Sequence, residues 1–140
     1  MAQVDFYVLG QGGEQARQLF ACKLAEKAWR LEHTVHILAA SRADAKQLDD
    51  LLWTFRDGSF VPHRLVGTDA PEAPVSIGCA GDEVGARDLL INLAEDLPPD
   101  AAAFPRIAEL VSSDDASRQR SRQRFAAYRE QGHDLNTHKI

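Results

Sequence analysis

The sequence predicts an α/β fold in which a mainly parallel sheet is flanked by helices. Three observations support this prediction. Short apolar segments of strand length alternate with segments of helical periodicity, the first four elements run strand, helix, strand, helix, and a glycine turn and a serine precede the two helices. Strands that alternate with helices build parallel sheets, because each helix carries the chain back to where the next strand starts. The 140 residues, 44% of them apolar, provide the core of one domain.

The first half of the chain predicts two strand–helix units. Residues 4–9 are rich in β-branched and aromatic side chains and form a strand, which the glycine turn at residues 10–13 ends. Residues 14–31 have helical periodicity, and residues 34–39 predict a second buried strand. Ser41 then begins a helix, because Asp44 lies three residues further on and the two form a capping-box-like pair.

The middle of the chain is predicted to add short strands to the sheet. Residues 60–66 form a short extended segment, and residues 67–74 form a turn and loop. Strands are expected at residues 75–79 and 89–93. The segment 81–87 between them fits a connection or a short helix.

The C-terminal part contains an arginine-rich helix. Residues 104–111, which precede it, fit a final strand or a turn of helix. Ser112 with Asp115 offers an N-terminal cap for the helix, and Gly132 is a natural stop beyond its end. The residues from about 133 onward are expected to form a polar tail.

Composition excludes several classes of protein. The net charge of −5 argues against a general nucleic-acid coat, which needs a broad basic face. Neither a charged-then-apolar leader nor a long uncharged apolar run is present, so we expect a cytoplasmic protein with no membrane partner. Cys22 and Cys79 are expected to be free thiols, with a disulfide as a minor alternative.

The glycine-rich segment Gly10 to Gly13 (GQGG) stands between a strand and a helix, where dinucleotide-binding proteins also carry glycines. It lacks the G-x-G-x-x-G spacing, and the chain has no Walker-type Gly-Lys-Ser/Thr, so a simple turn is favoured. A small nucleotide-binding or hydrolytic enzyme that uses this turn remains the alternative interpretation.

Metal-binding and nucleophilic side chains are not arranged for either task. The five histidines include no i,i+4 pair and are not accompanied by Cys-x-x-Cys, and no nucleophile elbow is present. Cys79 at a strand end is the best nucleophile candidate, but a small buried thiol is favoured there. We therefore predict no catalytic residue, no metal and no cofactor.

The arginines of the last helix are the strongest indication of a binding site. Arg118 and Arg122 are four residues apart and Phe125 is three further on, so the three share one face. Arg120 and Arg124 belong to a second stripe and are interpreted as bystanders. Guanidinium groups beside an aromatic ring suit a short peptide with acidic residues and an apolar end. A solvated charged face or a single-stranded DNA patch are the alternatives.

A second group of aromatic residues surrounds the end of the second helix. Trp53, Phe55 and Phe60 lie within a few positions of one another, next to a proline-containing loop. Large aromatic side chains are found both in protein cores and at the centres of protein interfaces. The sequence does not decide between core and interface for Trp53.

Several short motifs along nearly the whole chain resemble one known family. They are VDFYVL at 4–9, LW at 52–53, FVPH at 60–63, RFAAYR at 124–129 and DLNT at 134–137. In their order and spacing the chain is similar to the chi subunit of bacterial DNA polymerase III, a part of the clamp-loader assembly. The resemblance implies a Rossmann-like α/β domain that acts as a non-catalytic adaptor without a cofactor.

The resemblance also implies two partners, and contact with DNA only through them. Trp53 and Phe60 match the surface that binds the psi subunit of the clamp loader. The surface that binds the acidic C-terminal tail of single-stranded DNA-binding protein is matched by Val111, Arg118, Arg122 and Phe125. Lysine is usual at the position of Arg118 and tyrosine at that of Phe125, so charge and ring are kept but the phenol hydroxyl is absent.

Overall fold

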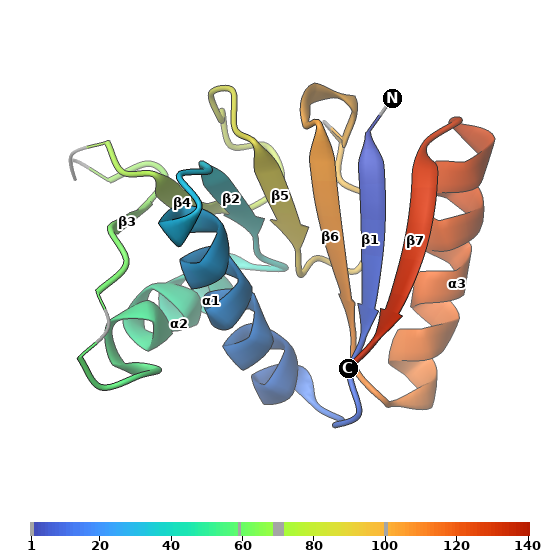
Figure 1. Cartoon of the computed structure of the whole chain (residues 1–140), viewed down its shortest axis with the longest axis horizontal. Helices are drawn as coiled ribbons and strands as arrows, with labels where there is room; N and C mark the ends of the chain where they lie inside the picture. Colours follow the sequence, from blue (N-terminus) through green and yellow to red (C-terminus); the bar gives the residue numbers. More distant parts are fainter. Residues whose placement is uncertain (1, 59, 69–71, 100) are drawn as a thin grey trace.

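The computed structural model describes residues 2–58, 60–68, 72–99 and 101–140. In this part of the chain seven strands form one sheet in the order β3-β4-β2-β5-β6-β1-β7, and every neighbouring pair is parallel (Figure 1). The sheet confirms the predicted α/β class. The strands are β1 (Gln3–Val8), β2 (Val35–Leu38), β3 (His63–Leu65), β4 (Val75–Gly78), β5 (Leu89–Asn92), β6 (Arg106–Val111) and β7 (Asp134–Lys139).

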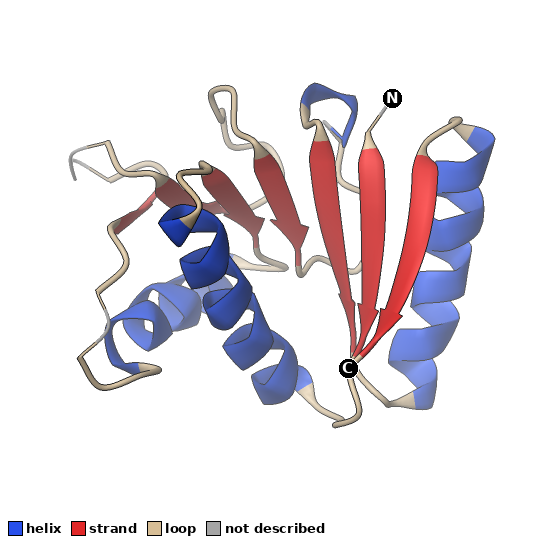
Figure 2. Ribbon diagram, viewed as in Figure 1, coloured by secondary structure: helices blue, strands red, loops and turns tan. Residues whose placement is uncertain are grey.

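Three α-helices and one short 3-10 helix complete the described elements. They are α1 (Glu14–Arg30), α2 (Arg42–Thr54), η1 (Ala101–Ala103) and α3 (Asp115–Glu130). Figure 2 shows the connection between β4 and β5 and the described parts of the connection between β3 and β4 as loops, and it shows η1 between β5 and β6. The segment 81–87 is therefore a connection without a helix. Of the loop predicted at 67–74, residues 69–71 lie outside the described residues.

The sheet separates two hydrophobic cores. On one face α1 and α2 cover strand residues such as Ile37, Ile77 and Leu110. On the other face α3 and the segment around η1 cover the alternate residues, such as Phe6, Leu90 and Ile107. Successive strand residues point to opposite faces, which explains how both sides of the sheet are apolar. Figure 1 shows α1 and α2 on one face and α3 against the opposite face beside β7.

Of the two predicted helix N-caps, Ser41 is confirmed and Ser112 is not. Ser41 is the N-cap of α2, and its hydroxyl accepts a hydrogen bond from the backbone N–H of Asp44 at 3.1 Å, as predicted. The predicted cap of α3 by Ser112 is wrong, because Asp114 occupies the N-cap position. Ser112 lies one residue beyond β6 and is 2% exposed, and its hydroxyl donates to the Asp114 carboxylate at 3.0 Å.

The largest difference from the expected structure is at the C terminus. Instead of a tail, residues Asp134–Lys139 form the edge strand β7, which pairs with β1 along its length. Gly132 (φ 85°) lies between α3 and this strand, consistent with the predicted stop. Most β7 side chains are exposed. The strand is held by main-chain pairing, by Leu135, which packs on the core under α3, and by His138, whose Nε2 lies 3.0 Å from the Asp5 carboxylate on β1. A polar edge strand lacks the apolar pattern by which strands are predicted.

Candidate functional site

A buried ion pair fixes α3 on the sheet. Glu109 of β6 is fully buried, and its carboxylate accepts hydrogen bonds from Arg124 Nε at 2.9 Å, from the Tyr128 hydroxyl at 2.6 Å and from Asn92 Nδ2 at 2.8 Å. Arg124 Nη1 also donates to the backbone oxygen of Glu95 at 2.8 Å. Arg124 is thus a structural residue, which the interpretation as a bystander on a solvated stripe did not foresee.

The charges and hydrogen bonds around Glu109 suit a structural role, in which α3 is held on the sheet. Burial raises the pKa of Glu109, while the Arg124 guanidinium and the two neutral donors oppose the rise. Burial and the neighbouring carboxylate raise the pKa of Tyr128, so its hydroxyl keeps its proton and donates. With Arg124 and Tyr128 held against the sheet, the rotation of α3 about its axis is fixed.

The opposite face of α3 carries the predicted arginines. Arg118 and Arg122 are exposed, and within the described residues neither forms an ion pair with an acidic side chain. Their guanidinium groups are therefore available to an external carboxylate. Arg120 is partly buried and also has no ion pair in the part of the chain that the structure describes.

The apolar members of this predicted site lie deeper. Phe125 is half-buried, and its ring packs on Phe6 with 5.2 Å between centroids. Val111, at the end of β6, belongs to the same hydrophobic cluster but is 2% exposed. The structure therefore brings Val111 and Phe125 together, yet Val111 offers very little surface to a ligand.

Sequence reasoning missed Arg129, whose guanidinium lies 5.1 Å from the centroid of the Phe125 ring. Phe125 and Arg129 are four residues apart, and this spacing places them on the same face of a helix, so the sequence could have indicated the contact.

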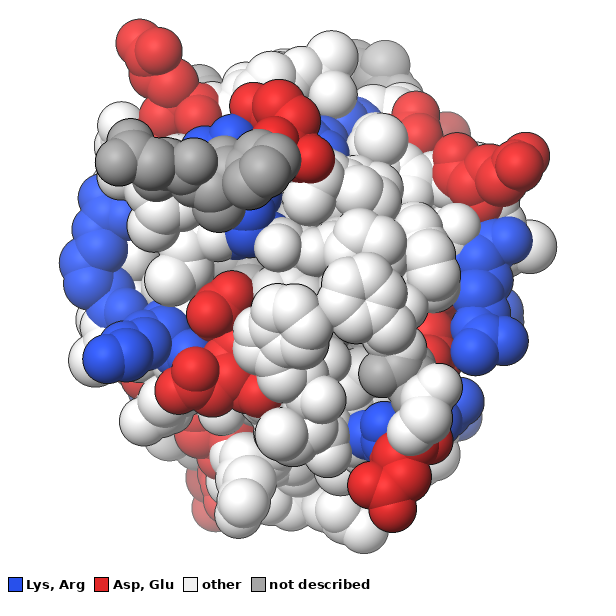
Figure 3. Space-filling view, turned by 90° about the vertical axis from the view of Figure 1, so that its left-hand side faces the viewer, with Lys and Arg blue, Asp and Glu red and all other residues white. Residues whose placement is uncertain are grey.

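The aromatic residues near the end of α2 are exposed. Trp53 and Phe60 are 55% and 56% exposed, and their ring centroids are 5.4 Å apart. The ring of His63 packs edge-on against that of Trp53, with 4.8 Å between centroids. Figure 3 looks onto this side of the molecule and shows uncharged surface bordered by acidic and basic groups. An exposed pair of large aromatic side chains is a common feature of protein interfaces.

The glycine turn lies where open α/β sheets usually bind ligands. The chain leaves β1 toward α1 on one face and leaves the neighbouring β6 toward α3 on the other, which creates a crevice at the carboxyl ends of the two strands. Here the Asp114 carboxylate accepts a hydrogen bond from the backbone N–H of Gly13 at 2.8 Å. A Cβ atom at Gly12 would lie 2.8 Å from the same carboxylate. The anion position at the start of α1 is thus occupied by the protein itself, which disfavours nucleotide binding there.

Metal binding and nucleophilic catalysis by cysteine have little support in the described residues. No group of three or more His, Cys, Asp or Glu side chains in them could hold a metal ion. Cys22 and Cys79 are free thiols, and burial raises the pKa of both, that of Cys22 to about 12, which opposes thiolate formation. No helix in the described part of the chain has the length and apolar character needed to span a membrane.

Comparison with known proteins identifies the family. A family model described as DNA polymerase III chi subunit, HolC, matches residues 1–136. A relative named DNA polymerase III subunit chi from Pseudomonas aeruginosa is 45% identical over 140 residues, which cover 100% of this chain and 98% of the relative. Relatives with the same name from Haemophilus influenzae and Escherichia coli are 36% and 34% identical, over 97% and 98% of this chain and 96% and 97% of their own lengths. The chain therefore belongs to the family of DNA polymerase III chi subunits.

Proposed function

We propose that this chain is an adaptor between the clamp loader and single-stranded DNA-binding protein. One surface binds the psi subunit, which connects the chain to the clamp loader in the cytoplasm. The other binds the acidic C-terminal tail of single-stranded DNA-binding protein, so that contact with DNA is indirect. Membership of the family makes the chain a replication accessory subunit rather than an enzyme.

The observation that carries the proposal is the orientation of α3. The anchor through Glu109 and Arg124 leaves Arg118 and Arg122 in solvent on the opposite side, next to the half-buried ring of Phe125. Guanidinium groups without internal partners pair well with the carboxylates of an acidic peptide. Because Val111 is covered, the apolar end of the peptide would rest mainly on Phe125 and the aliphatic part of Arg129.

The psi subunit would bind through the exposed rings of Trp53 and Phe60. These residues lie at the α2 end of the sheet, whereas α3 lies at the opposite end (Figure 1). Two separate surfaces allow both partners to bind at once, as an adaptor requires. An apolar pair of rings surrounded by charged groups also favours a partner helix or segment with its own apolar face.

Calorimetry with the C-terminal tail of single-stranded DNA-binding protein as a synthetic peptide tests the tail site. Arg122→Glu should weaken binding by about tenfold or more, since a hydrogen-bonded charge pair is replaced by repulsion. Arg120→Glu is the matched control, because it changes the net charge equally on the same helix but on another face. Wild-type affinity in Arg122→Glu would contradict the placement of the site. Equal losses in both variants would show general attraction rather than a defined face.

A further inference from the structure

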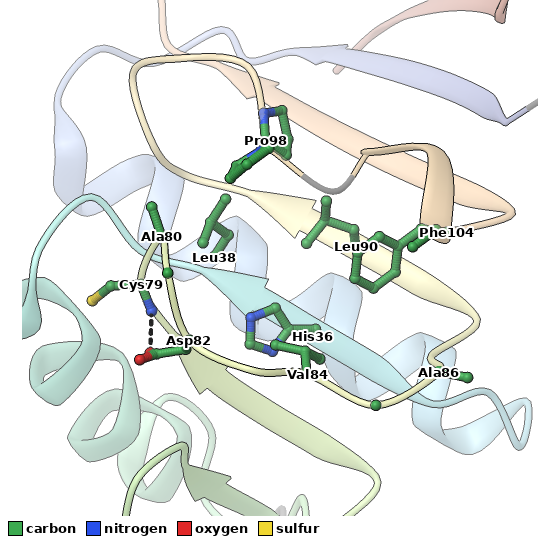
Figure 4. A pocket seen from close by; sticks show the side chains of 14 residues that line it. His36, Leu38, Cys79, Ala80, Asp82, Val84, Ala86, Leu90, Pro98 and Phe104 are labelled. Carbon is green, nitrogen blue, oxygen red and sulfur yellow. Dashed lines mark hydrogen bonds between the residues drawn. The ribbon is translucent and has the colours of Figure 1, made fainter.

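A cavity of about 290 Å³ lies on the α3 side of the sheet, between β2, β5 and the connecting segments. Figure 4 shows His36, Leu38 and Leu90 reaching it from the sheet, and Val84, Pro98 and Phe104 reaching it from the connections. Its interior is therefore mostly apolar. Its rim is formed by small residues that are largely exposed: Ala80, Gly81, Gly85, Ala86 and Ala103.

The topology of the sheet favours a ligand at this place. The chain leaves β2 toward α2 on one face, and it leaves the neighbouring β4 toward the opposite face, where Val84 joins the core. Ligands of open α/β sheets bind beside the carboxyl ends of strands at such a reversal. The cavity is lined by Leu38 at the end of β2 and by Cys79 just after β4. At the equivalent position between β1 and β6 the Asp114 carboxylate takes the backbone N–H of Gly13, and here the Asp82 carboxylate takes that of Cys79, but a cavity remains beside it.

His36, which lines the cavity, carries a polar atom without a hydrogen-bond partner among the described residues. The side chain is 2% exposed, and its Nδ1 lies 2.7 Å from the Ser76 hydroxyl on β4. Nε2, the ring nitrogen further from the backbone, is buried and has no hydrogen-bond partner among the described residues. Burial lowers the pKa of His36 to about 4, so the ring is neutral near pH 7. A buried polar atom without a partner is costly, and a ligand that satisfies it removes that cost.

Asp82, the acidic side chain in the described lining of the cavity, is already paired. The Asp82 carboxylate accepts from Arg42 Nη1 at 2.7 Å and Nη2 at 2.5 Å, and from the backbone N–H of Cys79 at 2.8 Å. With this carboxylate paired and His36 neutral, the cavity offers no free charge to a ligand. It therefore favours an uncharged molecule.

We propose that this cavity binds an uncharged, flat two-ring compound that makes one hydrogen bond to His36 Nε2. The volume is roughly twice the ~150 Å³ of an apolar cavity that admits benzene, and it lies near the lower end of the range for ligand pockets. Flat rings fit between the apolar side chains of Leu38, Leu90 and Phe104. The hydrogen bond to His36 selects a ring system with one polar group over a plain hydrocarbon.

The segment that covers the cavity can move to admit such a molecule. Among the described residues, the backbone groups of residues 83–87 form no hydrogen bond with other backbone groups. Val84 is the side chain of this segment that packs on the core under α3. Arg87 fixes the end of the segment, because its Nη1 donates to the backbone oxygens of Ala73 at 2.8 Å and Pro74 at 3.0 Å. Residues 83–86 before it have few such contacts, which is typical of segments with low local stability.

Two-dimensional NMR titration of the whole protein with indole, 1-indanone and indene tests the proposal. Indole offers a donor, indanone an acceptor, and indene the same size without a polar atom. We expect saturable shifts at the amides of Ala80, Gly81, Gly85 and Ala86. Indole or indanone should bind about two- to tenfold more tightly than indene, the effect of one hydrogen bond. Absence of saturable shifts at these amides, or equal binding of all three compounds, would overturn the proposal.

Variants locate the binding. Ala103→Trp, on the rim, should abolish the shifts, while Ala102→Trp on the adjacent exposed residue should leave them unchanged. Binding that survives Ala103→Trp would place the ligand elsewhere. His36→Leu should retain indene binding and lose the preference for the polar compound; if this variant does not fold, the comparison of compounds in the natural protein still decides.

N-acetyltryptophanamide distinguishes two sources of such a ring. Its binding assigns the cavity to a peptide side chain, and its exclusion while indole binds assigns it to a free small molecule.

Discussion

The carboxylate of Asp114 lies 2.8 Å from the backbone nitrogen of Gly13, although the two residues are 101 positions apart in the sequence. This hydrogen bond joins the start of α1 to the start of α3 at the crevice between β1 and β6. In nucleotide-binding sheets the same position receives a phosphate. Here the protein supplies its own anion, and the backbone N–H that a phosphate would use is taken. The relationship explains why nucleotide binding is disfavoured at this crevice of the sheet.

The first prediction concerns the loss of this anion. Asp114→Asn should lower the stability of the protein at pH 7, because a carboxylate accepts from Gly13 and Ser112 more strongly than an amide does. Hydrogen bonds from the Gly13 N–H and the Ser112 hydroxyl lower the pKa of Asp114. Its contribution is therefore complete above the unfolded pKa of about 4 and is lost as the pH falls through the lower folded value.

Urea denaturation of Asp114→Asn and of the natural protein at a series of pH values measures this effect. The difference in unfolding free energy should be constant from pH 7 down to about pH 5 and should shrink in more acidic solution. Asp115→Asn is the control, since Asp115 is exposed at the start of the same helix and its carboxylate makes no hydrogen bond in the described structure. A difference that grows on acidification would contradict the assignment.

The second prediction concerns the anchor of α3. Arg124→Met should destabilise the protein by about 3–5 kcal/mol, because it leaves the Glu109 carboxylate buried without its charged partner. Adding Glu109→Gln should restore part of the stability, since no buried charge then remains. Arg120→Met on the same helix should change the stability by no more than about 0.5 kcal/mol. Urea denaturation of the three variants and of the natural protein gives these differences, and equal effects of Arg124→Met and Arg120→Met would refute the anchor.

Apolar segments made much of this fold predictable. The strands β1, β2, β4 and β5 were expected within one or two residues of their bounds, because their side chains are buried on both faces and read as continuous apolar runs. The strand β7 was missed for the opposite reason. It lies at the sheet edge, most of its side chains face water, and its pairing with β1 is made mainly by the backbone, which has no sequence pattern.

The candidate sites were predictable in part. Helical periodicity was enough to place Arg118 and Arg122 on one side of α3, where the structure finds them exposed. The role of Arg124 was not predictable, because its partner Glu109 lies on another element and no local pattern joins the two. The exposure of Trp53 was also open, since it depends on how α2 packs. Cavities such as that beside His36 are formed by segments distant in sequence, and no single motif describes them.

The third prediction concerns the surface that we propose binds the psi subunit. Trp53→Ala and Phe60→Ala should each weaken binding of the psi subunit by about 2 kcal/mol or more, because large aromatic side chains dominate interfaces of this kind. Both residues are more than half exposed, so the variants should unfold at nearly the same temperature as the natural protein. Leu31→Ala is the control, since Leu31 is 61% exposed at the end of α1, away from this surface. Unchanged psi binding in both aromatic variants would move the interface elsewhere.

The fourth prediction concerns the salt dependence of tail binding. Exposed arginine–carboxylate pairs are screened within about 8 Å at physiological ionic strength, so the affinity for the acidic peptide should fall steadily as salt rises. Arg122→Gln removes one such pair and should reduce both the affinity at low salt and the slope against salt concentration. Arg30→Gln, on α1, is the control, because Arg30 is exposed but already pairs with Glu26. Calorimetry between low and high salt measures the slopes, and a natural protein whose affinity does not change with salt would show that apolar contacts with Phe125, rather than the arginines, hold the peptide.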